Sequence, residues 1–360
     1  MGEKKSNNDL VMLLLKGRTL IVLLALFIFF SIAAPNFLSV ATMLLIGKHV
    51  ALYGILAVGM TYVIITSGID LSVGAVVGFA GMIVGGLLQE GLTIEPLGVT
   101  LYFSVPAIFV IALVLGALIG AVNGLIITKL KVPAFITTLG TMYVLRGFAN
   151  LRSNGATYSS LAGNEALGNT GFEFFGSTTF GVPNGLIIFI VIAVIAGFVL
   201  SKTSFGWHTL AIGGNPKAAK FSGVKVDKDT IIVYIISGAC AAIVGVITTS
   251  QLMAAHPATG ESWEMNAIAA TVLGGTSMSG GIGTISGTVL GAFIIGVIND
   301  GMVMCGVSEF WQMVIRGVVV VLAVVIDVAQ RRLQAKIALQ AKAPAVPEKT
   351  GDAPAEKAKE

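Results

Sequence analysis

Charged residues are scarce in this chain of 360 residues, because Asp, Glu, Lys and Arg together make up only 11% of it. Hydrophobic residues make up 55%, and long apolar runs recur along the sequence. About 20 apolar residues in a helix are needed to cross ~30 Å of hydrocarbon. The chain is therefore predicted to be an all-α polytopic membrane protein that has membrane lipid as one of its partners.

Residues that carry covalent or metal chemistry are also few. Cys240 and Cys305 each lie alone in an apolar run, and the three histidines are widely separated. This spacing predicts no disulfide framework, no metal site and no bound cofactor. The sequence also lacks a GxxxxGK[ST] phosphate loop, a GxSxG turn and an HExxH helix. We therefore expect a protein that is not an enzyme and that hydrolyses no nucleotide.

Glycine, in contrast, is abundant, with 45 residues, and it is dense between 273 and 301. Gly283, Gly287 and Gly291 recur every fourth residue, so in a helix they share one face on which a second backbone can approach closely. The preceding segment mixes glycine with three polar residues, Thr276, Ser277 and Ser279. Non-helical backbone at membrane depth survives only where protein covers it or water reaches it. This pattern predicts a broken membrane helix, as in a subunit that forms a pore.

Ten candidate spans fall roughly at 19–34, 50–66, 71–89, 101–128, 133–153, 185–201, 230–253, 263–276, 284–303 and 311–330. They divide the chain into an N-terminus at 1–18, a transmembrane domain at 19–330 and a tail at 331–360. The tail is rich in Ala, Lys, Pro and Glu, a composition typical of disorder.

The basic residues test this count. With ten spans and both termini in the cytoplasm, 18 of the 22 Lys and Arg residues fall on the cytoplasmic side. The proposed outer loops, 90–98, 154–184 and 254–262, contain none. This asymmetry follows the positive-inside rule, and it accounts for the net charge of +4 without a nucleic-acid partner.

A second glycine series, Gly116, Gly120 and Gly124, lies in the fourth predicted span, and the first series lies in the ninth. An odd offset between similar segments is typical of inverted repeats, whose halves run in opposite directions. Glycine series also arise independently in membrane helices, so both interpretations stay open.

The cytoplasmic loop 202–229 contains one more predicted element. Pro216 stands at the first position of a short helix and Gly223 at its end, with Ala218 and Ala219 at the centre. Small residues on an exposed short helix indicate that another protein fits against it. The alternative is an interfacial helix that lysines hold to lipid headgroups.

Several ionisable residues lie within or beside the spans, where each costs at least ~2.5–3.5 kcal/mol if it faces lipid. Asp70 either lines a path or caps the next helix together with Ser72, and we favour the cap. Arg146 and Arg316 need carboxylate, carbonyl or water partners, and Asp300 is expected near the outer surface. The candidates for a translocation path or for structure are Asp70, Ser72, Asn123, Thr137, Thr138, Thr276, Ser277, Ser279 and Asn299.

A series of motifs in fixed order makes the chain resemble a known family. They are TSGIDLSVG at 66–74, NG at 123–124 with PAFITTLGT at 133–141, FG at 205–206 with IGGNPKAA at 212–219, SGV at 222–224, and IAA at 268–270 before GG at 274–275. The chain resembles, over about 35–330, the permease subunits of ATP-binding-cassette importers for monosaccharides such as ribose, galactose and xylose.

The resemblance implies the partners and the coupling residues. It implies a homodimer in a bacterial cell membrane, a separate ABC ATPase, and a periplasmic or lipid-anchored protein that delivers the sugar. The short helix would dock into the ATPase through Asn215, Pro216, Ala218, Ala219, Ser222 and Gly223. The alternatives are an ion-coupled secondary transporter, or a permease of this family for nucleosides, branched-chain amino acids or another small polar solute.

Overall fold

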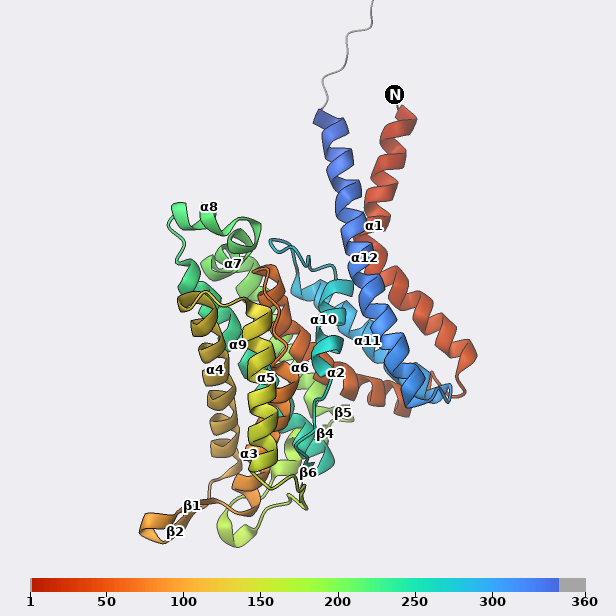
Figure 1. The fold of residues 1–360 in the computed structure, drawn as a ribbon. Helices are drawn as coiled ribbons and strands as arrows, with labels where there is room; N and C mark the ends of the chain where they lie inside the picture. The colour runs from red at the N-terminus through yellow and green to blue at the C-terminus, as the bar shows by residue number, and fades with distance from the viewer. Residues whose placement is uncertain (1, 343–360) are drawn as a thin grey trace, which may run out of the picture.

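The computed structural model describes residues 2–342, which form twelve α-helices and six short strands (Figure 1). The helices are α1 (Gly2–Ala33), α2 (Val40–Ile65), α3 (Val73–Gln89), α4 (Val105–Lys129), α5 (Ala134–Leu151), α6 (Asn184–Lys202), α7 (Ser204–Gly214), α8 (Pro216–Phe221), α9 (Val226–Leu252), α10 (Trp263–Leu273), α11 (Ile285–Met304) and α12 (Glu309–Lys342). Each of the ten predicted spans overlaps one of these helices.

The strands form three antiparallel pairs. One pair is the hairpin of β1 (Leu92–Ile94) and β2 (Val99–Leu101). Another joins β3 (Tyr158–Ser159) to β6 (Ala254–Ala255), and the third joins β4 (Thr178–Thr179) to β5 (Val182–Pro183). Short 3-10 helices lie among them at Glu95–Leu97, Glu165–Leu167 and Phe172–Phe175. All of these pieces connect helices, so the fold is helical.

Six helices of the described chain are long and apolar enough to cross a membrane: α2, α4, α6, α9, α11 and the first part of α12, Glu309–Ala329. The apolar part of α1, Thr19–Ala33, and α3 are shorter. The predicted class, an α-helical multi-pass membrane protein, is confirmed. The number of ten crossings is not confirmed by helix length and composition.

The largest differences from the predicted boundaries are at four places. α1 begins at Gly2, before the predicted start at 19. α2 begins at Val40, ten residues before the predicted start, because Ser39 accepts a hydrogen bond from the Thr42 backbone N–H and caps it. α7 was predicted as loop. α12 continues to Lys342, so helix covers the first part of the segment predicted to be disordered, whereas 343–360 lie outside the described residues.

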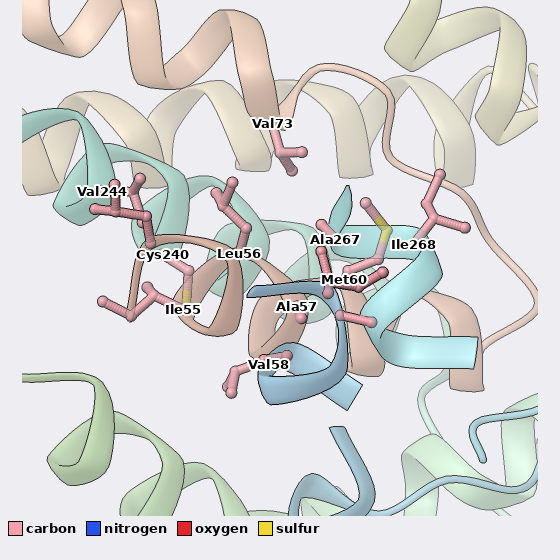
Figure 2. Packing of buried hydrophobic residues seen from close by; sticks show 14 of the residues in the cluster. Ile55, Leu56, Ala57, Val58, Met60, Val73, Cys240, Val244, Ala267 and Ile268 are labelled. Carbon is pink, nitrogen blue, oxygen red and sulfur yellow. The ribbon is translucent and has the colours of Figure 1, made fainter. Parts of the chain in front are cut away.

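The core is built around α2. In the most apolar stretch of α2, 67% of the residues are buried, whereas in that of α12 only 11% are buried. Figure 2 shows Ile55 and Leu56 of α2 packed near Cys240 and Val244 of α9. Burial of these apolar side chains places α2 at the centre and leaves α12 at the periphery.

The molecule has two distinct ends (Figure 1). We call the end that carries α7 and α8 the α8 end, and the end that carries the β1–β2 strands the hairpin end. α4 runs from the hairpin end to the α8 end, and α5 runs back beside it (Figure 1). The glycine series lie inside helix contacts. A Cβ at Gly120 would collide with the Tyr234 carbonyl of α9, and one at Gly291 with the Ala270 carbonyl of α10. Gly116, Gly120 and Gly124 therefore allow the close helix approach that the sequence predicts, and so do Gly287 and Gly291. Gly283 does not belong to this helix face, because it precedes the start of α11 at Ile285.

Candidate functional site

The short helix α8 forms where the sequence predicts it. Asn215 Oδ1 accepts hydrogen bonds from the backbone N–H groups of Lys217 and Ala218, both at 3.1 Å, which caps the first turn. Pro216 occupies the first helical position. The helix ends at Ser222, and Gly223 follows with a φ of +87°, a conformation that glycine adopts without strain.

The two central alanines of α8 face different ways. Ala218 is exposed, but Ala219 is only 5% exposed, so the expectation that a partner meets both is wrong for Ala219. Ala219 is small because the rest of this chain packs against it. Phe221, which the sequence analysis did not single out, is 91% exposed. The free surface of α8 is thus formed by Pro216, Lys217, Ala218, Lys220 and Phe221.

α7 carries α8 and is fixed to the helical bundle. His208 Nδ1 of α7 lies 3.0 Å from Asp229 Oδ2 of α9. Nearby, the Lys129 ammonium at the end of α4 lies 3.2 Å from Asp227 Oδ2, and Lys131 lies 3.5 Å from Oδ1 of the same carboxylate. These polar contacts join α4, α7 and α9 at the α8 end.

Three of the predicted polar residues belong to one buried network. Asp70 Oδ1 accepts hydrogen bonds from the Ser72 backbone N–H at 3.0 Å and from the Ser72 hydroxyl at 2.6 Å. Asn123 of α4 donates to Ser72 Oγ at 3.0 Å. Ser237 of α9, which the sequence analysis did not identify, donates to Asp70 Oδ2 at 2.7 Å. Asp70 is only 1% exposed, and its carboxylate is satisfied by Ser72 beside it and by Ser237 of α9, while Asn123 ties Ser72 to α4.

The network continues into α5. Thr141, another residue that was not predicted, donates to Asn123 Oδ1 at 2.6 Å. Thr138 Oγ1 lies 3.2 Å from the Ile69 carbonyl and donates within α5 to Ala134. Thr137 bonds only the Pro133 carbonyl. Thr137 and Thr141 also line an apolar cavity of about 600 Å³ between α4 and α5. The polar network therefore reaches the wall of this cavity.

The segment 274–284 between α10 and α11 is non-helical, so the predicted interruption is present. Ser277 Oγ donates to the Gly280 carbonyl at 3.2 Å, and the Ser279 carbonyl accepts from Ser67 Oγ at 3.0 Å. Thr276 is fully buried, and its hydroxyl has no protein partner among the described residues. The three predicted polar residues thus share one turn, which lies apart from the Asp70 network.

Arg146 of α5 holds two chain segments together. Its Nη1 donates to the carbonyls of Pro257 and Thr259, at 2.9 and 2.7 Å, and its Nη2 lies 3.4 Å from the Gly74 carbonyl. Gly74 at the start of α3 and Gly260 before α10 touch so closely that a Cβ on either would collide with the other's carbonyl. The predicted structural partner of Arg146 is therefore backbone carbonyl oxygen.

Asn299 lies elsewhere, beside an ion pair that was not predicted. Asp300 Oδ1 lies 2.6 Å from His49 Nδ1 and joins α11 to α2. Asp300 is buried, so it is not open to solvent, and its position near the outer surface stays a prediction. The predicted start of α2 was too late because Lys48 and His49 interrupt the apolar pattern there. Asn299 is also buried, and its Nδ2 has no partner among the described residues.

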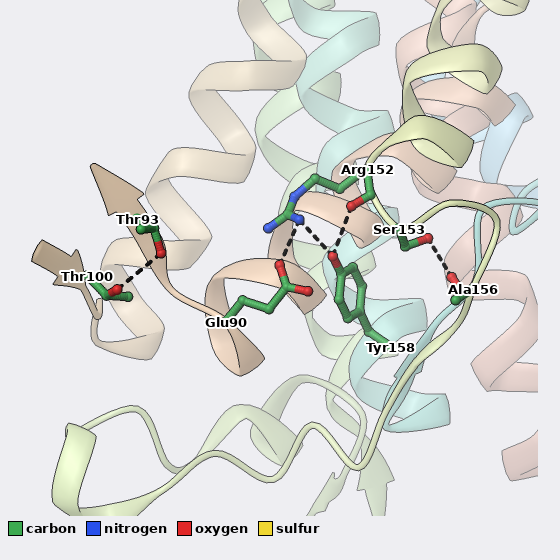
Figure 3. Close-up of polar contacts among 7 residues, drawn as sticks. All are labelled: Glu90, Thr93, Thr100, Arg152, Ser153, Ala156 and Tyr158. Atoms are coloured by element: carbon green, nitrogen blue, oxygen red, sulfur yellow. Dashed lines mark hydrogen bonds and ion pairs between the residues drawn. The ribbon is translucent and has the colours of Figure 1, made fainter. Parts of the chain in front are cut away.

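The hairpin end is fastened by side chains (Figure 3). Arg152 Nη1 lies 2.7 Å from Glu90 Oε2 and donates to the Tyr158 hydroxyl at 2.7 Å. The Tyr158 hydroxyl donates to the Arg152 carbonyl at 3.1 Å. Burial raises the pKa of the Tyr158 phenol, so this hydroxyl stays protonated. No cluster of three or more His, Cys, Asp or Glu side chains suited to a metal ion occurs among the described residues.

A multi-pass bundle with an interrupted helix, a buried polar network and an exposed capped helix at one end defines a membrane permease component. Residues 42–324 match the family model described as the branched-chain amino acid transport system permease component. The chain belongs to this family.

Relatives in the family are similar over most of the chain. The ribose import permease protein RbsC of Bacillus subtilis (strain 168) is 42% identical over 310 residues, which cover 85% of this chain and 90% of that protein. The ribose import permease of Escherichia coli (strain K12) is 40% identical over 316 residues, covering 87% and 94%. The galactose/methyl galactoside import permease of the same strain is 38% identical over 315 residues, covering 86% and 91%. No solved structure matches the chain.

Proposed function

We propose that this chain is the permease subunit of an ATP-binding-cassette importer that takes up a monosaccharide. The observation that carries the proposal is its 42% identity, over 85% of its length, to a protein named as a ribose import permease. Relatives named for galactose and L-arabinose import share 36–38% of residues, so the substrate class is a small sugar. The protein is not itself an enzyme, and ATP is hydrolysed by a separate ATPase subunit.

The ATPase docks on α8. The free surface of α8 carries the aromatic ring of Phe221 and the small side chain of Ala218. Lys217 and Lys220 lie beside them on the same helix. Asn215 and Gly223 fix the two ends of the helix, Pro216 and Ser222 complete its caps, and Ala219 packs it onto the bundle. A helix held in this way moves as a unit when its partner moves. The caps at both ends and the buried Ala219 support a docking role, because they hold α8 rigidly to the bundle with Phe221 exposed to a partner.

The α8 end lies in the cytoplasm of a bacterial cell, together with both termini. The distribution of basic residues supports this orientation, since loops 90–98, 154–184 and 254–262 at the hairpin side contain no Lys or Arg. α10 has 11 residues, which span ~16 Å, too short for a crossing by itself. The segment 253–262 follows α9 and contacts Gly74 of α3 through Gly260. This segment and α10 together make up one crossing. Ten crossings follow, with broken helices arranged as in an inverted repeat.

Two copies of the chain form one translocation path, and lipid surrounds them. The open surface of α5 supports this proposal, because Phe135, Tyr143 and Phe148, on different sides of the helix, are all more than half exposed. The cavity wall at Thr137 and Thr141 lies on the same helix. Asp70, Ser72, Asn123 and Thr138 support this wall from within, and Thr276, Ser277 and Ser279 form the turn at the α8 end. A periplasmic or lipid-anchored binding protein delivers the sugar to the hairpin end.

Uptake of labelled ribose, galactose and arabinose tests the proposal. The chain is expressed in cells that lack sugar importers, with and without the ATPase and binding protein of its own genome. We expect uptake of one of these sugars only when all three components are present. Uptake by the chain alone that collapses with a protonophore would instead identify an ion-coupled carrier.

Orientation is tested separately by labelling with an impermeant thiol reagent, after replacement of Cys240 and Cys305. A cysteine at Ala166 should react in intact cells and a cysteine at Asn215 should not. Labelling of the Asn215→Cys variant from outside the cell would contradict this orientation and indicate the opposite one.

A further inference from the structure

Three segments that are far apart in the sequence meet through their backbones at the α8 end. They are the end of α2 at Ile65, the end of α7 at Gly213, and the α10–α11 turn at Gly281. The Gly281 N–H donates to the Ile65 carbonyl at 2.8 Å. Gly213 lies against this hydrogen bond, so that a Cβ there would overlap both the Ile65 carbonyl oxygen and the Gly281 nitrogen. The contact has no room for a side chain on α7.

A second contact holds the same turn. Ser67, just after α2, donates from its hydroxyl to the Ser279 carbonyl at 3.0 Å. Gly280, with a φ of +81°, fits between Ser67 and the Gly213 carbonyl. The turn is thus held between the end of α2 on one side and the end of α7 on the other.

α7 transmits the position of α8 directly. Asn215 is the only residue between the two helices, and it caps both of them. Its N–H donates to the Ala211 carbonyl of α7 at 3.0 Å, while its side chain caps α8. A displacement of α8 therefore moves the end of α7, where Gly213 lies two residues away.

The other side of the junction leads into the bundle. The turn connects α10 to α11, and the two helices touch at Gly287 and Gly291, where a Cβ would collide with the backbone of α10. Thr276, buried in the turn with its hydroxyl unpartnered, lies between these helices and the junction. Movement of the turn would change the surroundings of the polar residues at the interruption.

We propose that Gly213, the Ile65 carbonyl and Gly281 form a positioning junction that transmits displacement of α8 to the α10–α11 turn. This inference rests on the proposed function, in which an ATPase displaces α8. The junction works because backbone meets backbone without flexible side chains between them. It is separate from the docking surface, since Gly213 is buried and does not lie on α8.

The adjacent residue supplies a matched control. Gly213 and Gly214 both belong to α7, and neither has a positive φ, but Gly214 has nothing within 4 Å of the position of a Cβ. Gly213→Ala and Gly214→Ala thus add the same methyl group to the same helix with the same change of helix propensity. They differ only in whether the methyl group enters the junction.

The measurement uses the complete complex in proteoliposomes with its ATPase and binding protein. We expect both variants to co-purify with the ATPase as the wild type does. For Gly213→Ala, the sugar transported per ATP hydrolysed should fall at least tenfold, whereas Gly214→Ala should keep the wild-type ratio. A wild-type ratio for Gly213→Ala overturns the junction. Loss of the ATPase by Gly213→Ala also overturns it, because Gly213 would then belong to the docking surface.

Ser67→Gly provides the test if Gly213→Ala fails to insert. Ser67 has a φ of +62°, which glycine adopts without strain, so this variant removes the bond to Ser279 without straining the backbone. Thr66→Ala is its control, because among the described residues the Thr66 hydroxyl bonds only the Val63 carbonyl of α2. We expect the transport ratio to fall roughly fivefold for Ser67→Gly, from the loss of one hydrogen bond, and to stay unchanged for Thr66→Ala. If Ser67→Gly and Thr66→Ala transport the same amount of sugar per ATP hydrolysed, the proposed junction is overturned. If the ATPase does not co-purify with the wild-type chain, the proposed function is contradicted instead.

Discussion

Arg146 lies within α5 and Arg152 directly follows its last residue, Leu151, yet the two arginines stabilise the protein in different ways. Arg146 donates to carbonyls of two separate segments, at Pro257 and Thr259 before α10 and at Gly74 in α3. Arg152 pairs with Glu90 and Tyr158 at the hairpin end, where the Glu90 side chain is 49% exposed. Carbonyls that lose a buried donor have no water to replace it, whereas a partly exposed ion pair does. Pro257 and Gly74 are buried, so the contact of α3 and α5 with the segment before α10 depends on Arg146 more than the hairpin end depends on Arg152.

The largest loss of stability is expected from Arg146→Met. The variant keeps most of the aliphatic stem and leaves the carbonyls of Pro257 and Thr259 without their donor. An unsatisfied buried polar group costs ~1–3 kcal/mol, so we expect a decrease of about 3 kcal/mol in the free energy of unfolding. Thermal unfolding of the purified protein in detergent measures it. A variant that melts with the wild type would show that these carbonyls do not need Arg146.

A smaller loss is expected from Gly120→Ala in the α4–α9 contact. The new methyl group would meet the Tyr234 carbonyl and force the helices apart, at a cost of about 1–3 kcal/mol. Gly140→Ala in α5 is the control, because nothing lies within 4 Å of a Cβ there. The same unfolding measurement should separate the two variants, and equal stability would mean that α4 and α9 adjust to the extra volume.

The smallest loss is expected from Arg152→Met. Its ion pair with Glu90 is partly exposed, and such pairs contribute ~0–1 kcal/mol, so the change in the free energy of unfolding should stay below about 1 kcal/mol. Unfolding at low and high salt checks the result, since salt screens an exposed pair. A loss as large as that of Arg146→Met would abolish the distinction between the two arginines.

Local sequence signals predicted α8 well. Proline at the start, asparagine before it and glycine after it act within a few residues, and the helix runs from Pro216 to Phe221 as a result. The glycine series predicted close helix contacts for the same reason, because a missing side chain is visible in the sequence itself.

Contacts between distant segments could not be predicted in this way. Ser237 and Thr141 complete the Asp70 network from α9 and α5, and neither stands out among many Ser and Thr residues in apolar helices. Ala219 is buried because of the way α8 packs on the bundle. A helix of six residues is too short for its sequence pattern to show which side is buried. The contact of Asp300 with His49 joins residues 251 positions apart, which no local pattern reveals.

The central claim is that α8 receives the ATPase, and one pull-down tests it most directly. Ala218→Glu adds a carboxylate to the exposed side of α8, and Ala166→Glu adds the same group to an exposed site at the hairpin end. We expect the Ala218→Glu permease to reach the membrane in normal amount, with at least tenfold less co-purified ATPase, a loss of ~1.4 kcal/mol or more in binding free energy. The Ala166→Glu permease should retain the ATPase fully. Wild-type recovery of the ATPase with Ala218→Glu, together with wild-type uptake, would contradict the account.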